Sequence, residues 1–80
     1  MNHIKVRYFA AFREATEIEC EQVETTAASA AELFGECASR FDGLQSYSAA
    51  MVAINDEMSD WSAPLSEGDE VLFFPPVAGG

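Results

Sequence analysis

Apolar and polar residues alternate at the start of the chain with the period of two that is typical of a strand with one buried face. Ile4, Val6 and Tyr8 are separated by the two basic residues Lys5 and Arg7. The next residue on the basic side is an aromatic one, Phe9. We therefore expect a first strand near residues 4–8, followed by an aromatic side chain on its polar face.

A second alternation follows a segment, residues 12–16, that we interpret as a turn. Residues 17–21 predict a second strand with an acidic outer face and an apolar inner face. The outer residues are Glu17, Glu19 and Glu21, and the inner ones are Ile18 and Cys20. Carboxylates on such a face guard against edge-to-edge association. A cation site is the alternative, but no glycine-containing calcium loop accompanies these residues, and we favour a solvated face.

The middle of the chain has the longer period of a helix. Ser29 and Glu32 have capping-box spacing, which predicts a helix start. An apolar stripe follows at helical spacing, and Glu36 and Arg40 are placed to pair at i, i+4. Gly43 is the predicted stop. The stripe consists of Ala30, Leu33 and Cys37 with Ala31, Phe34, Ala38 and Phe41.

The last part of the chain predicts a hairpin and a final strand. Residues 44–50 are interpreted as a loop, and a short strand at 51–54 precedes the turn pair Asn55-Asp56. We expect Trp61 and Leu65 to close one end of the core. The strand at 70–74 is apolar on both faces and is therefore expected to be central. This order of elements predicts an α+β fold with one globular domain over residues 1–74.

Composition limits what such a domain can do. The chain has 80 residues, is 49% hydrophobic and has a net charge of −10. Folding a chain of this size buries roughly 60% of its surface, which supplies a small core and no deep substrate cleft. The negative charge disfavours nucleic acid and anionic membranes as partners and favours a basic protein surface.

The cysteines give no sign of a metal site or a disulfide framework. Cys20 and Cys37 are far apart in sequence, and His3 is the only histidine. Both cysteines fall on apolar periodicities, so we predict buried thiols, although a persulfide relay is chemically open to either. The start of the chain lacks the unbroken apolar stretch of a secretory leader. We therefore predict a cytoplasmic protein with no bound metal.

The end of the chain, residues 75–80, is predicted to be an extended tail. Pro75-Pro76 cannot donate ladder hydrogen bonds and favours a polyproline-like path. Val77 and Ala78 are followed by Gly79 and Gly80, which lack side chains and can enter a passage too narrow for other residues. A frayed terminus is the alternative reading of two glycines alone.

The same end carries a family resemblance. Residues 68–80 read GDEVLFFPPVAGG, residues 4–10 read IKVRYFA, and an Arg13-Glu14 pair follows. Together these closely resemble the small subunits of molybdopterin synthases, which are ubiquitin-like β-grasp sulfur carriers. The resemblance implies a mixed sheet of about four to five strands packed on one main helix. It spans the whole chain in length and element order, although residues 16–50 add little beyond their pattern.

The resemblance also implies a chemistry for Gly80. A partner enzyme of the ubiquitin-activating type uses ATP to adenylate the terminal carboxylate, and a sulfur donor protein then converts it to a thiocarboxylate. The tail, Pro75, Pro76, Val77, Ala78 and Gly79, enters the active site of the large synthase subunit, where sulfur passes to cyclic pyranopterin monophosphate. Two deliveries build the dithiolene of molybdopterin. This chain would not be catalytic alone and would hold no cofactor stably.

Partner contacts follow from the same resemblance. Apolar residues at positions matching Phe9, Met58 and Phe74 form a binding patch beside the tail, and the complex contains two small and two large subunits. Two other functions stay open: a carrier for thiamine synthesis or tRNA thiolation, or a protein modifier using the same Gly-Gly end. A plain interaction module with an inert tail is the alternative from a different class.

Overall fold

The computed structural model describes residues 1–41, 44 and 50–75. These residues contain five strands and two helices. They follow one another as β1 (Asn2–Tyr8), α1 (Ala11–Thr16), β2 (Cys20–Thr25), α2 (Ala30–Arg40), β3 (Met51–Ile54), β4 (Glu57–Ser59) and β5 (Glu70–Phe74).

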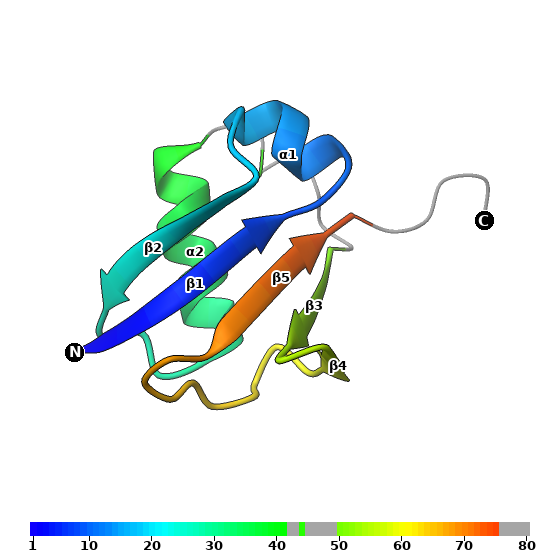
Figure 1. Ribbon diagram of the computed structural model, residues 1–80. Helices are drawn as coiled ribbons and strands as arrows, with labels where there is room; N and C mark the ends of the chain where they lie inside the picture. Colours follow the sequence, from blue (N-terminus) through cyan, green and yellow to red (C-terminus); the bar gives the residue numbers. More distant parts are fainter. Residues whose placement is uncertain (42–43, 45–49, 76–80) are drawn as a thin grey trace.

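The strands form one mixed sheet in the order β2-β1-β5-β3-β4. β1 and β5 are parallel, and the other neighbouring pairs are antiparallel. The strand at 70–74 is thus central, as its apolar pattern predicts. Figure 1 shows α2 crossing one face of the sheet, with the ends of β1 and β5 at the same edge. This is the β-grasp arrangement that the sequence resemblance implies.

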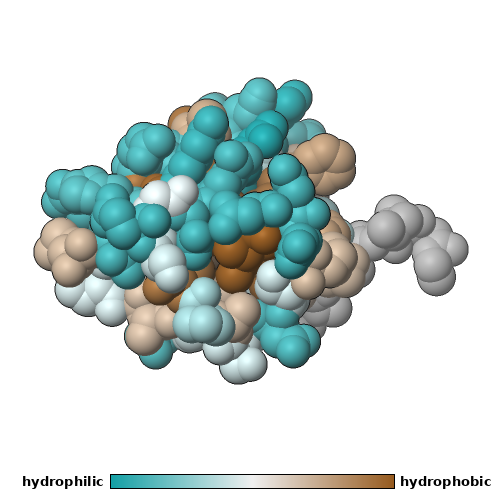
Figure 2. All heavy atoms as spheres, turned by 60° about the horizontal axis from the view of Figure 1, so that its bottom comes forward, coloured by the Kyte–Doolittle hydropathy of each residue, from teal (hydrophilic) through white to brown (hydrophobic). Residues whose placement is uncertain are grey.

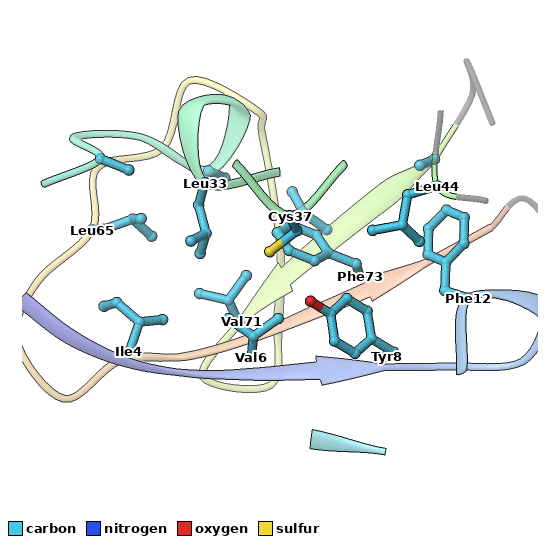
Figure 3. Close-up of a cluster of buried hydrophobic side chains, with 14 residues drawn as sticks. Ile4, Val6, Tyr8, Phe12, Leu33, Cys37, Leu44, Leu65, Val71 and Phe73 are labelled. Carbon is cyan, nitrogen blue, oxygen red and sulfur yellow. The ribbon is translucent and has the colours of Figure 1, made fainter. Parts of the chain in front are cut away.

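The core lies between the sheet and α2. Side chains from β1 and β5 point toward Leu33 and Cys37 of the helix, and Phe12 of α1 closes one end (Figure 3). Leu65 is buried at the other end, and Trp61 stacks on Phe73 with 5.9 Å between ring centroids. Both residues therefore contribute to the core, but they do not close one end together as predicted. Trp61 packs on Phe34, which contacts Phe12 at the end opposite Leu65.

The start of α2 follows the predicted cap. The Ser29 hydroxyl accepts a hydrogen bond from the backbone N–H of Glu32 at 3.3 Å, and the Glu32 carboxylate accepts one from the N–H of Ala28 at 3.2 Å. The predicted pairing of Glu36 with Arg40 is wrong, because both side chains bond to β2 instead. Glu36 accepts from the Thr25 hydroxyl at 2.6 Å, and Arg40 donates to Glu21 at 2.7 Å.

The other end of α2 lies earlier than predicted. The helix ends at Arg40, with the extended Phe41 as its cap. The predicted stop, Gly43, lies outside the described residues, as does the predicted loop at 45–49. Leu44, which we also assigned to that loop, is buried in the core.

The segment between the first two strands differs from its prediction in two ways. Residues 11–16 form a short helix instead of a turn, because Phe12 is buried and the Thr16 hydroxyl donates back to the Phe12 carbonyl at 3.0 Å. The helix ends at Glu17 in a left-handed conformation (φ 64°), so β2 starts only at Cys20. Glu17 and Glu19 are exposed and Ile18 packs against the core, as predicted. From Cys20 onward the faces are opposite to the prediction: Glu21 faces α2 and Cys20 is exposed.

The predicted hairpin between β3 and β4 is confirmed. Asn55 and Asp56 both have positive φ, 53° and 70°. A type I′ turn requires positive φ at both central positions, and Asn and Asp tolerate it better than most residues. The turn fixes the register that places Met58 opposite Ala53.

Candidate functional site

The hydrogen-bonded ladder of β5 ends at Phe74, immediately before the proline pair. Phe74 is the last β5 residue to pair with β3, opposite Met51. Pro75 follows it and is half-buried. The end of the strand therefore lies where the sequence predicts it. Of the predicted tail, Pro76, Val77, Ala78, Gly79 and Gly80 lie outside the described residues.

The face of the sheet away from α2, here called the outer face, carries a row of side chains defined by the strand register. The row takes one residue from each strand, in the order β2, β1, β5, β3 and β4. Its members are Cys20, Arg7, Leu72, Ala53 and Met58. The row is apolar over β5, β3 and β4 and polar over β1.

A second row lies nearer the end of the sheet. Phe74 pairs with Met51, and the backbone N–H of Phe9 donates to the carbonyl of Phe73 at 3.1 Å. This bond extends the parallel ladder by one step beyond β1 and places Phe9 beside Phe74. The aromatic residue that interrupts the polar side of the first strand thus lies next to the last residue of the central strand.

Together the two rows form an apolar area that we call the outer patch, made up of Phe9, Met51, Met58, Leu72 and Phe74. Phe9 is 61% exposed and Met58 64% exposed, and the other three are partly exposed. In the view of Figure 2, hydrophilic side chains cover much of the visible surface and surround smaller hydrophobic areas. Exposed apolar clusters of this kind mark interaction surfaces more often than chance.

The structure thus brings together the three residues predicted as a patch, Phe9, Met58 and Phe74, on one face. It adds Met51 and Leu72, which were not among the predicted patch residues. Leu72 has the same strand parity as Phe74, and that signal was sufficient to find it. Met51 could not be found from its own strand, because its face depends on the pairing of β3 with β5.

An ion pair borders the outer patch. Arg7 donates from Nη1 to Glu70 Oε2 at 2.9 Å, and this bond raises the pKa of the guanidinium. The side chains of Arg7 and Glu70 are 45% and 36% exposed, so water screens the pair and it contributes little to stability. The patch is therefore bordered by two opposite charges that compensate each other.

A hollow of about 540 Å³ adjoins the patch at Met58. It is wide open to solvent, and its lining mixes apolar, hydroxyl and carboxylate side chains. The lining residues are Met58, Ser59, Asp60, Ser62, Ala63 and Pro64. Its open shape suits a contact with another surface better than the enclosure of a small substrate.

The histidine lies at the opposite end of β1 from the patch. Its Nε2 is 3.0 Å from Glu24 and its Nδ1 is 3.1 Å from Glu67. The hydrogen bond with Glu24 and the charge of Glu67 raise the pKa of His3, and the bond from the His3 backbone N–H lowers the pKa of Glu67. This cluster joins β1, β2 and the loop before β5, and it is remote from the outer patch.

The two cysteines have different environments, which corrects one prediction. Cys37 is buried as predicted, and burial raises the pKa of its thiol. Cys20 is exposed on the outer face opposite Arg7, because β2 starts later than its alternation suggested. Neither cysteine is in a disulfide. Within residues 1–41, 44 and 50–75, no three His, Cys, Asp or Glu side chains are grouped as a metal site requires.

No helix in the described part of the chain is long and apolar enough to span a membrane. The candidate site is the outer patch, an apolar area at the end of the sheet where the central strand stops. The first residue of the predicted tail follows this patch directly.

Known proteins are similar to this chain in both sequence and fold. The molybdopterin synthase sulfur carrier subunit of Escherichia coli (strain K12) is 33% identical over 81 residues, covering 96% of this chain and 99% of the relative. A putative molybdopterin converting factor subunit 1 from Pyrococcus furiosus superposes with a TM-score of 0.85 at 28% identity, covering 96% of this chain and all of that one.

A third relative was solved together with a partner. The structure is a protein–protein complex of subunits 1 and 2 of molybdopterin-converting factor from Helicobacter pylori 26695. It matches with a TM-score of 0.68 at 29% identity and covers 98% of this chain and 99% of the matched one. The model of the ThiS family matches residues 6–80. On this evidence the chain belongs to the ThiS family.

Proposed function

We propose that this protein is the sulfur carrier subunit of a molybdopterin synthase. The observation that carries the proposal is the combination of the GDEVLFFPPVAGG end with an apolar outer patch at the point where β5 ends. Its relationship to the E. coli sulfur carrier subunit, which covers nearly the whole of both chains, supports the same assignment.

The reacting group is the carboxylate of Gly80. A carboxylate is a poor electrophile, so a ubiquitin-activating-type enzyme first transfers AMP from ATP to it, with release of pyrophosphate. A sulfur donor protein then displaces AMP and leaves a thiocarboxylate. Its sulfur is ionised at neutral pH and is nucleophilic. The large synthase subunit uses this sulfur on cyclic pyranopterin monophosphate, and two such transfers complete the dithiolene.

The outer patch is the surface that binds the large subunit. Phe9, Met58 and Phe74 present apolar side chains on one face, and Pro75 continues the chain from its edge. A subunit that covers this face is therefore close to the start of the tail, residues 75–80, and can take Gly79 and Gly80 into its own active site. By family resemblance the assembled synthase contains two small and two large subunits.

The part of this chain in the reaction is to supply the acyl group, and neither its histidine nor its buried cysteine is placed for catalysis. His3, its single histidine, is bonded to Glu24 and Glu67 at the far end of β1. Cys37 is buried, and its raised pKa makes it a weak nucleophile. Catalysis is accordingly assigned to the partners, and ATP is bound by the activating enzyme.

The cytoplasm is the proposed site of action. Cys20 and Cys37 are both free, and free thiols of this kind persist where glutathione and thioredoxin keep cysteines reduced. The activating enzyme also needs ATP, which the cytoplasm supplies.

Reconstitution tests this function. The full chain is loaded with sulfur by the activating enzyme, mixed with the large subunit and incubated with cyclic pyranopterin monophosphate. We expect conversion of the precursor to molybdopterin and no conversion with a variant lacking Gly80. A loaded chain that binds the large subunit but yields no molybdopterin would contradict the assignment and point to thiamine or tRNA thiolation instead.

A further inference from the structure

The turn that follows β1 contains a strained alanine. Ala10 has φ 53° and ψ −125°. The backbone N–H of Phe12 donates to the carbonyl of Phe9 at 3.1 Å across it, so residues 9–12 form a turn of type II′ with Ala10 at its first central position. That position is dominated by glycine, because a Cβ there meets the neighbouring backbone.

Among residues 1–41, 44 and 50–75, three others with side chains also have positive φ, but their backbone angles are less unfavourable for their residue types. Glu17 has φ 64° and ψ 16°, close to the left-handed helical region that ordinary residues visit. Asn55 and Asp56 belong to the two residue types that tolerate positive φ best. Ala10 is distinct because its ψ lies outside the left-handed helical region.

The surrounding structure holds the turn in place on both sides. Before it, the N–H of Phe9 is bonded to the carbonyl of Phe73 on β5. After it, Phe12 is fully buried and packs on Phe34 of α2 with 5.8 Å between ring centroids. Strained residues persist where the fold fixes them in this way, and they concentrate at functional sites.

Packing among the residues that the structure describes does not account for the alanine, since Ala10 is exposed. The turn lies at the edge of the sheet where β1 and β5 both end (Figure 1), next to Phe9 of the outer patch. A surface that covers Phe9 and Phe74 and approaches Pro75 therefore passes over this turn.

We propose that Ala10 is a recognition residue, whose methyl group extends the outer patch and contacts an apolar surface of the large subunit. The inference rests on the proposed function, in that the partner is the large subunit. It explains why an alanine occupies a turn position that favours glycine: the methyl group lowers the stability of the free chain and contributes to binding.

Three full-length variants distinguish a recognition role of Ala10 from the alternative that the fold merely tolerates an alanine at this position. Ala10→Gly removes both the strain and the methyl group, whereas Ala10→Ser keeps a Cβ and with it the strain. Glu17→Gly relieves a milder positive φ at the other end of α1 and is the matched control. Thermal midpoints are followed by Trp61 fluorescence, and affinity for the purified large subunit is measured by calorimetry at one elevated ionic strength, where the lost charge of Glu17 matters least.

Ala10→Gly is expected to raise the midpoint by roughly 4 °C and to weaken binding about fourfold, the effect of one buried methyl group. Ala10→Ser should stay close to wild type in both measurements, and Glu17→Gly should bind like wild type. Wild-type affinity in Ala10→Gly would overturn the proposal, as would a lower midpoint. Failure of the wild-type chain to bind would instead count against the proposed function.

Discussion

The side-chain amide of Asn55 donates a 3.0 Å hydrogen bond to the carboxylate of Asp69. Its carbonyl oxygen also accepts a hydrogen bond from the backbone N–H of Glu70 at 3.0 Å. Asn55 is at the same time the first central residue of the β3–β4 hairpin, with φ 53°. One side chain therefore ties the hairpin to the first residue of the central strand.

Replacing Asn55 with Ala should lower the free energy of unfolding by about 2 kcal/mol, because two hydrogen bonds and a residue suited to positive φ are lost together. Asn55→Gly loses the same hydrogen bonds but keeps the positive φ without strain, so it should lie between Ala and wild type. Urea unfolding followed by Trp61 fluorescence measures both. Equal stabilities for the Ala variant and wild type would show that the tie contributes nothing.

A second tie joins the sheet to α2 through Glu21. The Tyr8 hydroxyl donates to this carboxylate at 2.7 Å, and Arg40 donates to its other oxygen at 2.7 Å. The Glu21 side chain is only 17% exposed. Tyr8→Phe should therefore cost about 1–2 kcal/mol of stability, since a shielded carboxylate loses one donor.

The same substitution in a Glu21→Gln background provides the control for this tie. If the hydroxyl acts through the carboxylate charge, Tyr8→Phe costs less there than in the wild-type chain. Equal costs in the two backgrounds would assign the effect of the hydroxyl to packing alone.

The cluster around His3 predicts a pH dependence of stability. Bonds from both ring nitrogens to carboxylates require an imidazolium, because a neutral ring has one N–H. The pKa of His3 is raised above 6.5. Its contribution to the free energy of unfolding is therefore complete below pH 6.5 and is lost as the pH rises through the folded-state pKa. The pKa of Glu67 is lowered below 4.5, so its contribution is present above that pH and is lost on further acidification.

Stabilisation by this cluster should therefore be largest between pH 4.5 and 6.5. We expect His3→Gln to be less stable than wild type in that window, with the difference shrinking at alkaline pH. Urea unfolding across the pH range and an NMR titration of the imidazole check it. A histidine pKa at or below 6.5 would contradict the geometry.

The outer patch gives a prediction about partner binding. Phe9→Asp and Phe74→Asp should each weaken binding to the large subunit by about tenfold or more, because a charge replaces an aromatic anchor. Gln22→Asp, an exposed change on the outer face of β2, adds the same charge away from the patch and should have a small effect. Circular dichroism should find all three folded; an unfolded Phe74→Asp would contradict its place on the outer face.

Most of the fold could be read from the chain because local patterns and tertiary packing agree. The capping box at Ser29, the hairpin at Asn55 and the central strand at 70–74 were all predicted. For residues 17–21 the prediction was correct only for the faces of Glu17, Ile18 and Glu19. α1 ends at Glu17 and β2 begins only at Cys20, and in this strand Glu21 lies on the inner face and Cys20 on the outer face.

The candidate site was likewise predicted in part. Phe9, Met58 and Phe74 were predicted as a patch, and the strand register places them on one face. The place of Met51 on the outer face follows only from the pairing of β3 with β5. The sequence of β3 alone does not indicate this pairing. The strain at Ala10 is likewise invisible in the sequence, because an alanine before a helix carries no signal of its backbone angles.

The end of the chain is the part on which the proposed chemistry depends most. Adding one residue after Gly80, or removing Gly80, should abolish sulfur loading while leaving the free energy of unfolding unchanged, because the ladder of the last strand ends at Phe74. Urea unfolding and a loading assay with the activating enzyme measure the two effects. Normal loading of either variant would contradict a terminal mechanism.

Intact-mass spectrometry of the full chain, purified from cells that contain the activating enzyme, tests the carrier function most directly. We predict a population in which sulfur replaces one oxygen atom, which fragmentation places at Gly80 and which disappears on incubation with the large subunit and cyclic pyranopterin monophosphate. A chain that keeps an unmodified carboxylate in the presence of the active enzyme and sulfur donor would contradict the sulfur-carrier function.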